Sequence, residues 1–243
     1  MKILVVNDDG IDAKGIHILA EAAKELGEVW VVAPDRQCSA MSQCITVRGE
    51  LAVRKREFPV EGVHAYSVSG TPADCVKVAL LHILPQKPDI VFSGINFGYN
   101  AGQDILYSGT VGAAVEALSN GIPAIAFSNE ANDIYDVVEK YLLLIAKDLS
   151  GRSLPSDTLW NVNFPGCSLE DYQGILENRI PADTQFYQDY YEVKEQSENG
   201  FLLEAGGNPI KEAQEGPDIR AVMDRYISIG TITSGVLTSA REV

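Results

Sequence analysis

The chain has 243 residues, of which 46% are hydrophobic and 22% are charged, so it carries enough apolar material for a large folded core. Its 34 Asp and Glu residues outnumber its 19 Lys and Arg residues and give a formal net charge of -15. Non-specific binding to nucleic acid or to an anionic membrane requires a basic surface, so this balance argues strongly against a nucleic-acid scaffold. A phosphate-bearing partner would need a local device, such as a metal ion or a helix N-terminus.

The cysteines and the apolar runs predict a cytoplasmic protein. The four cysteines form no C-x-x-C pair and the three histidines are scattered, so we expect no zinc site and interpret the thiols as buried or incidental. The apolar run at residues 3–6 is too short for a signal peptide, and no run approaches the roughly 18 apolar residues of a membrane span. We therefore expect no membrane partner.

Strands alternate with helices over residues 1–150. Short apolar runs rich in β-branched residues indicate strands buried on both faces, and apolar residues at helical spacing indicate the helices between them. The predicted strands cover residues 3–6, 29–33, 89–92 and 124–127, and the predicted helices cover residues 16–26, 72–84, 110–118 and 133–149. Repeated strand–helix units predict an α/β fold with a Rossmann-like, mostly parallel sheet and helices on both faces.

The pattern is less regular towards the C-terminus. Residues 159–164 and 226–232 are predicted strands and residues 218–224 a short helix. Asn199-Gly200 separates two short runs in the manner of a β-hairpin turn. We expect a single domain, in which residues 1–164 form the sheet and the site, while residues 165–243 form an extended excursion that could be exchanged between subunits.

The ligands of a parallel α/β sheet bind beyond the carboxyl ends of its strands. The first predicted strand is followed by Asn7-Asp8-Asp9-Gly10, where a dinucleotide-binding fold would have a glycine-rich turn. Two adjacent carboxylates repel a phosphate unless a cation intervenes, and hard cations such as Mg²⁺, Mn²⁺ and Ca²⁺ prefer oxygen ligands. Asp8 and Asp9 are therefore candidate metal ligands, although a turn that caps the next helix would explain the same residues.

The next two strand ends also offer oxygen donors. The polar loop at residues 33–46 contains Ser39 and Ser42, and Asn96 lies between two glycines in residues 93–100. A hydroxyl and an amide oxygen can complete the shell of a hard cation. A solvated loop and a glycine-rich turn are the simpler explanations, but they do not explain why three successive strand ends all provide oxygen atoms.

Ser108-Gly109-Thr110 stand at the start of the predicted helix over residues 110–118. Hydroxyl groups and free N–H groups at a helix start form an anion site, and they equally form an ordinary N-cap, so both roles can hold together. The sequence contains no P-loop, nucleophile-elbow or zincin motif.

Five segments carry a family resemblance. They are Asn-Asp-Asp-Gly at 7–10, Ala-Pro-Asp-Arg at 33–36 followed by Ser39 and Ser42, Gly-Thr-Pro-Ala-Asp-Cys-Val at 70–76, Ser-Gly-Ile-Asn at 93–96 with Gly98 and Asn100, and Tyr-Ser-Gly-Thr-Val-Gly-Ala-Ala at 107–114. In order and spacing they resemble the SurE family, the survival protein E 5'/3'-nucleotidases. The chain departs from the usual family pattern at Cys38-Ser39-Ala40, where the family has Arg-Ser-Gly, and at Gly230-Thr231-Ile232, where it has Thr-Pro-Leu.

The resemblance implies a phosphomonoesterase that hydrolyses nucleoside monophosphates with one divalent metal ion, such as Mg²⁺ or Mn²⁺, in each subunit. It implies that Asp8, Asp9, Ser39 and Asn96 hold the metal, that Asp8, Asp9 and Asn96 act in catalysis, and that Ser39, Ser108, Gly109 and Thr110 contact the substrate. One of the two aspartates could also accept the proton of the attacking water. The resemblance further implies a homodimer or tetramer with exchanged C-terminal elements.

Two other classes of function remain open at this point. An oxidoreductase or transferase could use the same sheet, but the glycine-rich dinucleotide fingerprint is missing. A non-catalytic module that senses a nucleotide or a metal ion would need the same ligands and no turnover.

Overall fold

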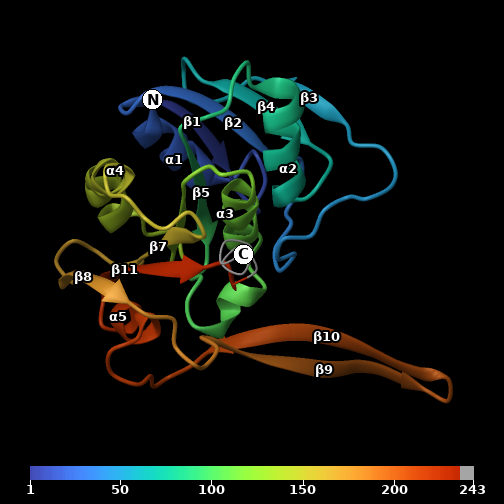
Figure 1. The fold of residues 1–243 in the computed structure, drawn as a ribbon. Helices are drawn as coiled ribbons and strands as arrows, with labels where there is room; N and C mark the ends of the chain where they lie inside the picture. Colours follow the sequence, from blue (N-terminus) through green and yellow to red (C-terminus); the bar gives the residue numbers. More distant parts are fainter. Residues whose placement is uncertain (236–243) are drawn as a thin grey trace, which may run out of the picture.

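The computed structural model describes residues 1–235. Over these residues a nine-stranded sheet runs through the body of the protein (Figure 1). In spatial order its strands are β3 (Val53–Arg56), β4 (His64–Val68), β2 (Glu28–Pro34), β1 (Lys2–Val6), β5 (Ile90–Phe97), β6 (Ala124–Asn129), β7 (Thr158–Phe164), β11 (Tyr226–Thr233) and β8 (Gly174–Arg179). Neighbouring strands are parallel except for the pairs β3–β4 and β7–β11.

Helices cover both faces of this sheet, as predicted. One face carries α1 (Lys14–Lys24) and α4 (Asp136–Ser150), and the other carries α2 (Pro72–Val78) and α3 (Gly109–Ser119). Side chains of β1 alternate between the two cores, with Ile3 and Val5 on the α1 and α4 side and Leu4 and Val6 on the other. The apolar run of β1 is uninterrupted because both of its faces are buried.

The predicted helices and strands of residues 1–164 are all present, with three differences. The helix predicted to run to residue 84 is α-helical only as far as Val78 and continues as the π-helical turn η1 (Ala79–Ile83). The strand predicted at residues 89–92 continues as β5 through Phe97, so Asn96 lies within the strand and not beyond it. Strands β3 and β4 were not predicted, because β3 is a largely exposed Val-Arg-Lys-Arg run with no apolar pattern.

The C-terminal part contains the predicted hairpin, helix and final strand. The hairpin consists of β9 (Tyr187–Ser197) and β10 (Gly200–Pro209), and it projects away from the body of the protein (Figure 1). After α5 (Asp218–Met223), β11 enters the sheet between β7 and the unpredicted strand β8. A Cβ atom at Gly230 would collide with the main-chain oxygen of Arg179 in β8, which explains the glycine at this position.

None of the helices in residues 1–235 has the length and apolar character needed to cross a membrane.

Candidate active site

Asp8 and Asp9 follow β1 directly and are held by two elements that are distant in the sequence. Asp8 is buried, and its Oδ1 accepts a hydrogen bond of 2.6 Å from the hydroxyl of Thr110 in α3. The main chain of Thr110 also hydrogen-bonds to the Asp8 carboxylate. Asp9 accepts a hydrogen bond of 2.9 Å from the main-chain N–H of Phe97, the residue after Asn96. The carboxylate pair therefore lies where the ends of β1 and β5 meet the start of α3.

The alternative role of these aspartates as caps of the next helix is wrong. The N-cap of α1 is Ala13, and no side chain hydrogen-bonds to the free N–H groups of that helix start. The conformation of Gly10, with φ of 99°, does provide the turn that leads from the aspartates towards α1.

The start of α3 is fitted closely to Asp8. A Cβ atom at Gly109 would lie 2.9 Å from both Cβ and Oδ2 of Asp8, so a larger residue would displace that carboxylate. The hydroxyl of Ser108 accepts a hydrogen bond of 3.0 Å from the N–H of Val111, which makes Ser108 the N-cap of α3. The N-cap interpretation of Ser108 is therefore confirmed, and it leaves the anion-binding role of the helix start open.

Burial makes both carboxylates harder to ionise in the absence of a cation, and the charge of Asp9 adds to this at Asp8. Burial, followed by the charge of Asp9, raises the pKa of Asp8 to about 6, while the hydrogen bonds from Thr110 act in the opposite direction. Burial also raises the pKa of Asp9, against hydrogen bonds from Phe97 and from the Gln37 side chain. Neither carboxylate forms an ion pair within residues 1–235. A bound cation would relieve this unfavourable charge.

Ser39 lies in an exposed loop that begins beside Asp8. The N–H of Cys38 donates a hydrogen bond of 2.7 Å to the main-chain oxygen of Asp8, and the Cys38 thiol is buried and lies 3.7 Å from the oxygen of Gly70. Ala40 has a φ of 56°, the left-handed conformation that favours glycine, which is the usual residue of the family pattern at this position. Ala40 therefore adopts a conformation that favours glycine although it carries a side chain.

Asn96 is half-buried near the end of β5. Its Nδ2 donates a hydrogen bond of 2.8 Å to the main-chain oxygen of Gly98, which turns the amide so that its oxygen is the atom left for a ligand. Gly94 and Gly98, on either side of Asn96, have φ values of 134° and 126°, which favour glycine, although residues 90–97 form strand β5 and not a turn. The role of Asn96 as a metal ligand stays a prediction. Within residues 1–235, no hydrogen bond joins Ser39 or Asn96 directly to either aspartate.

A buried cluster of asparagines that was not predicted from the sequence holds the segment following Asn96. The main-chain oxygen of Asn100 accepts hydrogen bonds of 2.8 and 3.0 Å from the amides of Asn161 and Asn163, and its own side chain donates to Ser128. These contacts fasten the segment that follows Asn96 to β6 and β7. The sequence does contain a pattern that indicates this cluster, because Asn161 and Asn163 alternate with apolar residues in an otherwise buried strand.

The donor set suits a hard divalent cation. Nowhere in residues 1–235 do three or more His, Cys, Asp or Glu side chains gather as a metal site. The candidate ligands are instead two carboxylates with a hydroxyl and an amide oxygen, which is the chemistry of Mg²⁺ and Mn²⁺ and not of Zn²⁺. A mainly apolar cavity of about 370 Å³ lies at the opposite, amino-terminal edge of β5, β6 and β7, and it contains none of these ligands.

The fold and the site define an α/β protein with an acidic, oxygen-rich centre at the carboxyl edge of a mostly parallel sheet. The family model described as Survival protein SurE matches residues 3–185. The chain belongs to the SurE family.

Individual relatives agree with this assignment along nearly the whole chain. The sequence is 39% identical over 237 residues to a Clostridium botulinum protein named 5'-nucleotidase SurE, covering 94% of this chain and 91% of the relative. It is 38% identical over 236 residues to a Thermosipho melanesiensis protein of the same name, covering 96% of this chain and 91% of the relative. The crystal structure of a Sure protein from Aquifex aeolicus matches with a TM-score of 0.81 and 35% identity, covering 100% of this chain and 97% of that one.

Proposed function

We propose that this chain is a divalent-metal-dependent phosphomonoesterase that hydrolyses nucleoside monophosphates to nucleosides and phosphate, a 5'/3'-nucleotidase. The relatives named 5'-nucleotidase SurE support the reaction. The observation that carries the proposal is the contact between Asp8 and Thr110, since it joins a buried carboxylate pair to the start of a helix. A cation site and an anion site then share one edge of the sheet, which is what a phosphate ester bound to a metal ion requires.

In this proposal Asp8 and Asp9 supply the negative charge that holds one Mg²⁺ or Mn²⁺ ion, and Ser39 and Asn96 add neutral oxygen ligands. When bound, the ion would polarise the phosphorus centre and lower the barrier to attack by water. An incoming phosphate would approach the turn at the start of α3, which Ser108 and Gly109 define. The N–H of Val111 already donates to the Ser108 hydroxyl and the main chain of Thr110 to Asp8, so the phosphate would meet this turn beside the carboxylate. The hydroxyl of Thr110 already donates to Asp8, so Thr110 orients this carboxylate beside the phosphate.

Either aspartate could accept a proton from the attacking water. Phosphoryl transfer depends mainly on positioning and electrostatic stabilisation, so the site needs few further groups.

The experiment is phosphate release from a panel of 5'- and 3'-nucleoside monophosphates by the purified protein, with Mg²⁺, with Mn²⁺ and with a chelator. We expect release only with metal, and we expect Asp8→Asn to abolish it. Binding of nucleotide or metal without phosphate release would identify a sensing module instead. Full activity after exhaustive chelation would refute the metal mechanism.

We also propose that the protein works as a cytoplasmic homodimer or tetramer. The projecting hairpin exposes large apolar side chains, including Tyr191, Phe201 and Leu202, which are 67%, 64% and 57% exposed. Apolar side chains gathered on a projecting element are typical of a surface that another subunit covers. The four cysteines are free thiols, which is in keeping with a reducing compartment.

A further inference from the structure

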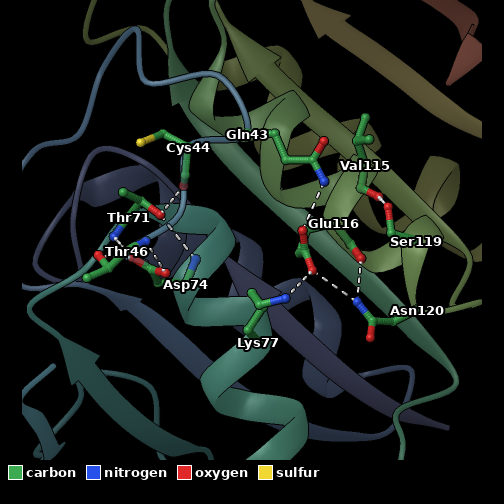
Figure 2. Close-up of polar contacts among 10 residues, drawn as sticks. All are labelled: Gln43, Cys44, Thr46, Thr71, Asp74, Lys77, Val115, Glu116, Ser119 and Asn120. Carbon is green, nitrogen blue, oxygen red and sulfur yellow. Dashed lines mark hydrogen bonds and ion pairs between the residues drawn. The ribbon is translucent and has the colours of Figure 1, made fainter. Parts of the chain in front are cut away.

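Residues 37–46, here called the Ser39 loop, are fastened to α2 and α3 by two buried carboxylates outside the site (Figure 2). The loop itself is mostly exposed and has no regular secondary structure. Its position therefore depends on its contacts with the helices on either side.

The first anchor is Asp74 in α2. Its Oδ1 accepts a hydrogen bond of 2.9 Å from the N–H of Thr46, and its Oδ2 accepts one of 2.7 Å from the Thr46 hydroxyl. The hydroxyl of Thr71 donates a bond of 2.5 Å to the main-chain oxygen of Cys44. Hydrogen bonds from the loop and from Thr71 lower the pKa of Asp74 although burial alone would raise it, so the carboxylate is held in its charged form.

The second anchor is Glu116 in α3. Its Oε2 accepts a hydrogen bond of 2.9 Å from the side-chain amide of Gln43, while its Oε1 accepts from Asn120 and lies 3.4 Å from Nζ of Lys77. Figure 2 shows these side chains converging on Glu116 from the loop, from α2 and from α3 itself. Glu116 therefore joins all three elements, although it is only 6% exposed.

Between the two ends of the loop, Ser42 contacts the phosphate side of the site. Its N–H donates to the main-chain oxygen of Tyr107 at 2.9 Å, and its hydroxyl donates to that of Leu106 at 2.7 Å. A Cβ atom at Gly112 would collide with the main chain of Ser42. The absence of a side chain at Gly112 therefore allows the loop to pack directly against α3. A shift of the loop would thus move Ser39 relative to both the aspartates and the turn before α3.

We propose that Asp74 and Glu116 are positioning residues, which fix the Ser39 loop on α2 and α3 and so set the affinity of the site for its divalent metal ion. This inference rests on the proposed function, because it takes Ser39 as a metal ligand. Both carboxylates are buried, and a buried charge without hydrogen-bond partners is costly. Donors from the loop provide part of the hydrogen bonds that each carboxylate accepts.

The test removes the hydrogen-bond donors that the loop contributes to Glu116 and Asp74, and it leaves the residues of α2 and α3 unchanged. Gln43→Ala removes the donor to Glu116, and Thr46→Val removes one donor to Asp74 at nearly constant shape. The readouts are the Mn²⁺ dissociation constant, measured calorimetrically without substrate, and the melting temperature of the metal-free protein. We expect the double variant to bind Mn²⁺ about tenfold more weakly, because two hydrogen bonds to charged groups are lost.

Two further variants make the test specific. Thr46→Ser keeps the hydroxyl. The single variant Thr46→Ser, in which Gln43 is unchanged, should therefore bind Mn²⁺ as the wild type does. Ser119→Ala is the matched control, because Ser119 is on α3 beside Asn120 but donates only to Val115 of its own helix. We expect this control to leave Mn²⁺ affinity unchanged.

Unchanged Mn²⁺ affinity in the double variant, with or without a lower melting temperature, would overturn the positioning role. If Ser39→Ala still weakened Mn²⁺ binding in that case, the proposed function would stand. Unchanged Mn²⁺ binding in both Ser39→Ala and Asp8→Asn would instead remove the proposed metal site. If the double variant fails to fold, the single variants and the Thr46→Ser and Thr46→Val pair decide the question, and equal affinity within that pair overturns the role of Asp74.

Discussion

The hydroxyl of Thr110 donates a hydrogen bond of 2.6 Å to the carboxylate of Asp8, although 102 positions separate the two residues in the chain. The bond connects the end of β1 with the first turn of α3. It fixes the orientation of a carboxylate that burial and the neighbouring Asp9 make unfavourable to ionise. Ionisation of Asp8 in the metal-free protein therefore lowers the free energy of unfolding, and this effect can be measured through the pKa of Asp8.

The first prediction concerns the stability of the metal-free protein as a function of pH. Because the pKa of Asp8 is raised from 3.8 to about 6, its contribution to stability is complete below pH 4 and is lost as the pH rises through 6. A shift of about two units corresponds to about 3 kcal/mol. Asp8→Asn does not titrate, so its free energy of unfolding relative to wild type should rise by up to that amount between pH 4 and 6 and then level off.

Denaturant titrations of both proteins at several pH values, with chelator present, measure this difference. Other ionisable groups are common to the two proteins, so their effects largely cancel, except at Asp9, which loses the repulsion of the Asp8 charge in the variant. Saturating Mn²⁺ at pH 7 should reverse the order, because the variant lacks one anionic ligand. A stability difference that does not change with pH would show that Asp8 does not carry this charge.

The second prediction concerns the close fit between α3 and Asp8. In Gly109→Ala the new Cβ must displace the Asp8 carboxylate, since it would start 2.9 Å from Cβ and Oδ2 of that residue. We expect phosphatase activity to fall by about 10- to 100-fold, because a displacement of about 1 Å in a catalytic group has an effect of this size. Gly151→Ala is the control, since its Cβ would make only an ordinary contact of 3.4 Å with Asp148. Equal kcat/KM values for the two variants would contradict the prediction.

The third prediction separates the cysteines. Burial raises the pKa values of the Cys38, Cys75 and Cys167 thiols, whereas Cys44 is exposed. Iodoacetamide at pH 7.5 should therefore label Cys44 first and leave activity intact, because a buried thiol with a raised pKa is a poor nucleophile. Peptide mass spectrometry gives the site of labelling, and Cys44→Ser should abolish the fast phase. Rapid labelling of Cys38 with loss of activity would show that this thiol is part of the site.

The fourth prediction concerns assembly through the hairpin. Tyr191→Glu combined with Phe201→Glu places charges on its exposed apolar surface, so we expect a smaller assembly by light scattering at equal protein concentration. These side chains are solvent-exposed within the chain, so circular dichroism should be unchanged. Gln188→Glu adds a charge at an already polar, exposed position of β9 and is the matched control. An unchanged mass for the double variant would rule out this surface as the subunit contact.

The strands that could be predicted are those whose environment is uniform along their length. β1 and β2 lie between two helical layers, so every position after the first residue of each strand is buried and apolar, and the pattern is clear. β3 and β8 lie at the edges of the sheet with exposed faces, and their residues carry no such pattern. The pairing of β3 and β8 depends on the strands beside them in the sheet, and the local sequence does not encode this pairing.

The candidate site was predicted as separate pieces. The rule that ligands bind at the carboxyl ends of parallel strands identified the aspartates, Ser39 and Asn96 one at a time, and the helix start at residues 108–110 was identified separately as an N-cap or anion site. The contact between Asp8 and Thr110 depends on how α3 packs against β1, and no pattern within either segment encodes it. The anchoring carboxylates Asp74 and Glu116 were missed for the same reason, because a charged residue on a helix ordinarily faces solvent.

The place of β11 between β7 and β8 has a consequence for synthesis of the chain. β8 is made long before β11, yet in the folded sheet it pairs with β11 alone. Until the last strand leaves the ribosome, β7 and β8 both present unpaired main-chain groups, and such edges are templates for pairing with other chains. A premature stop codon after the hairpin would leave the candidate metal ligands Asp8, Asp9, Ser39 and Asn96 in place and still yield an aggregation-prone product.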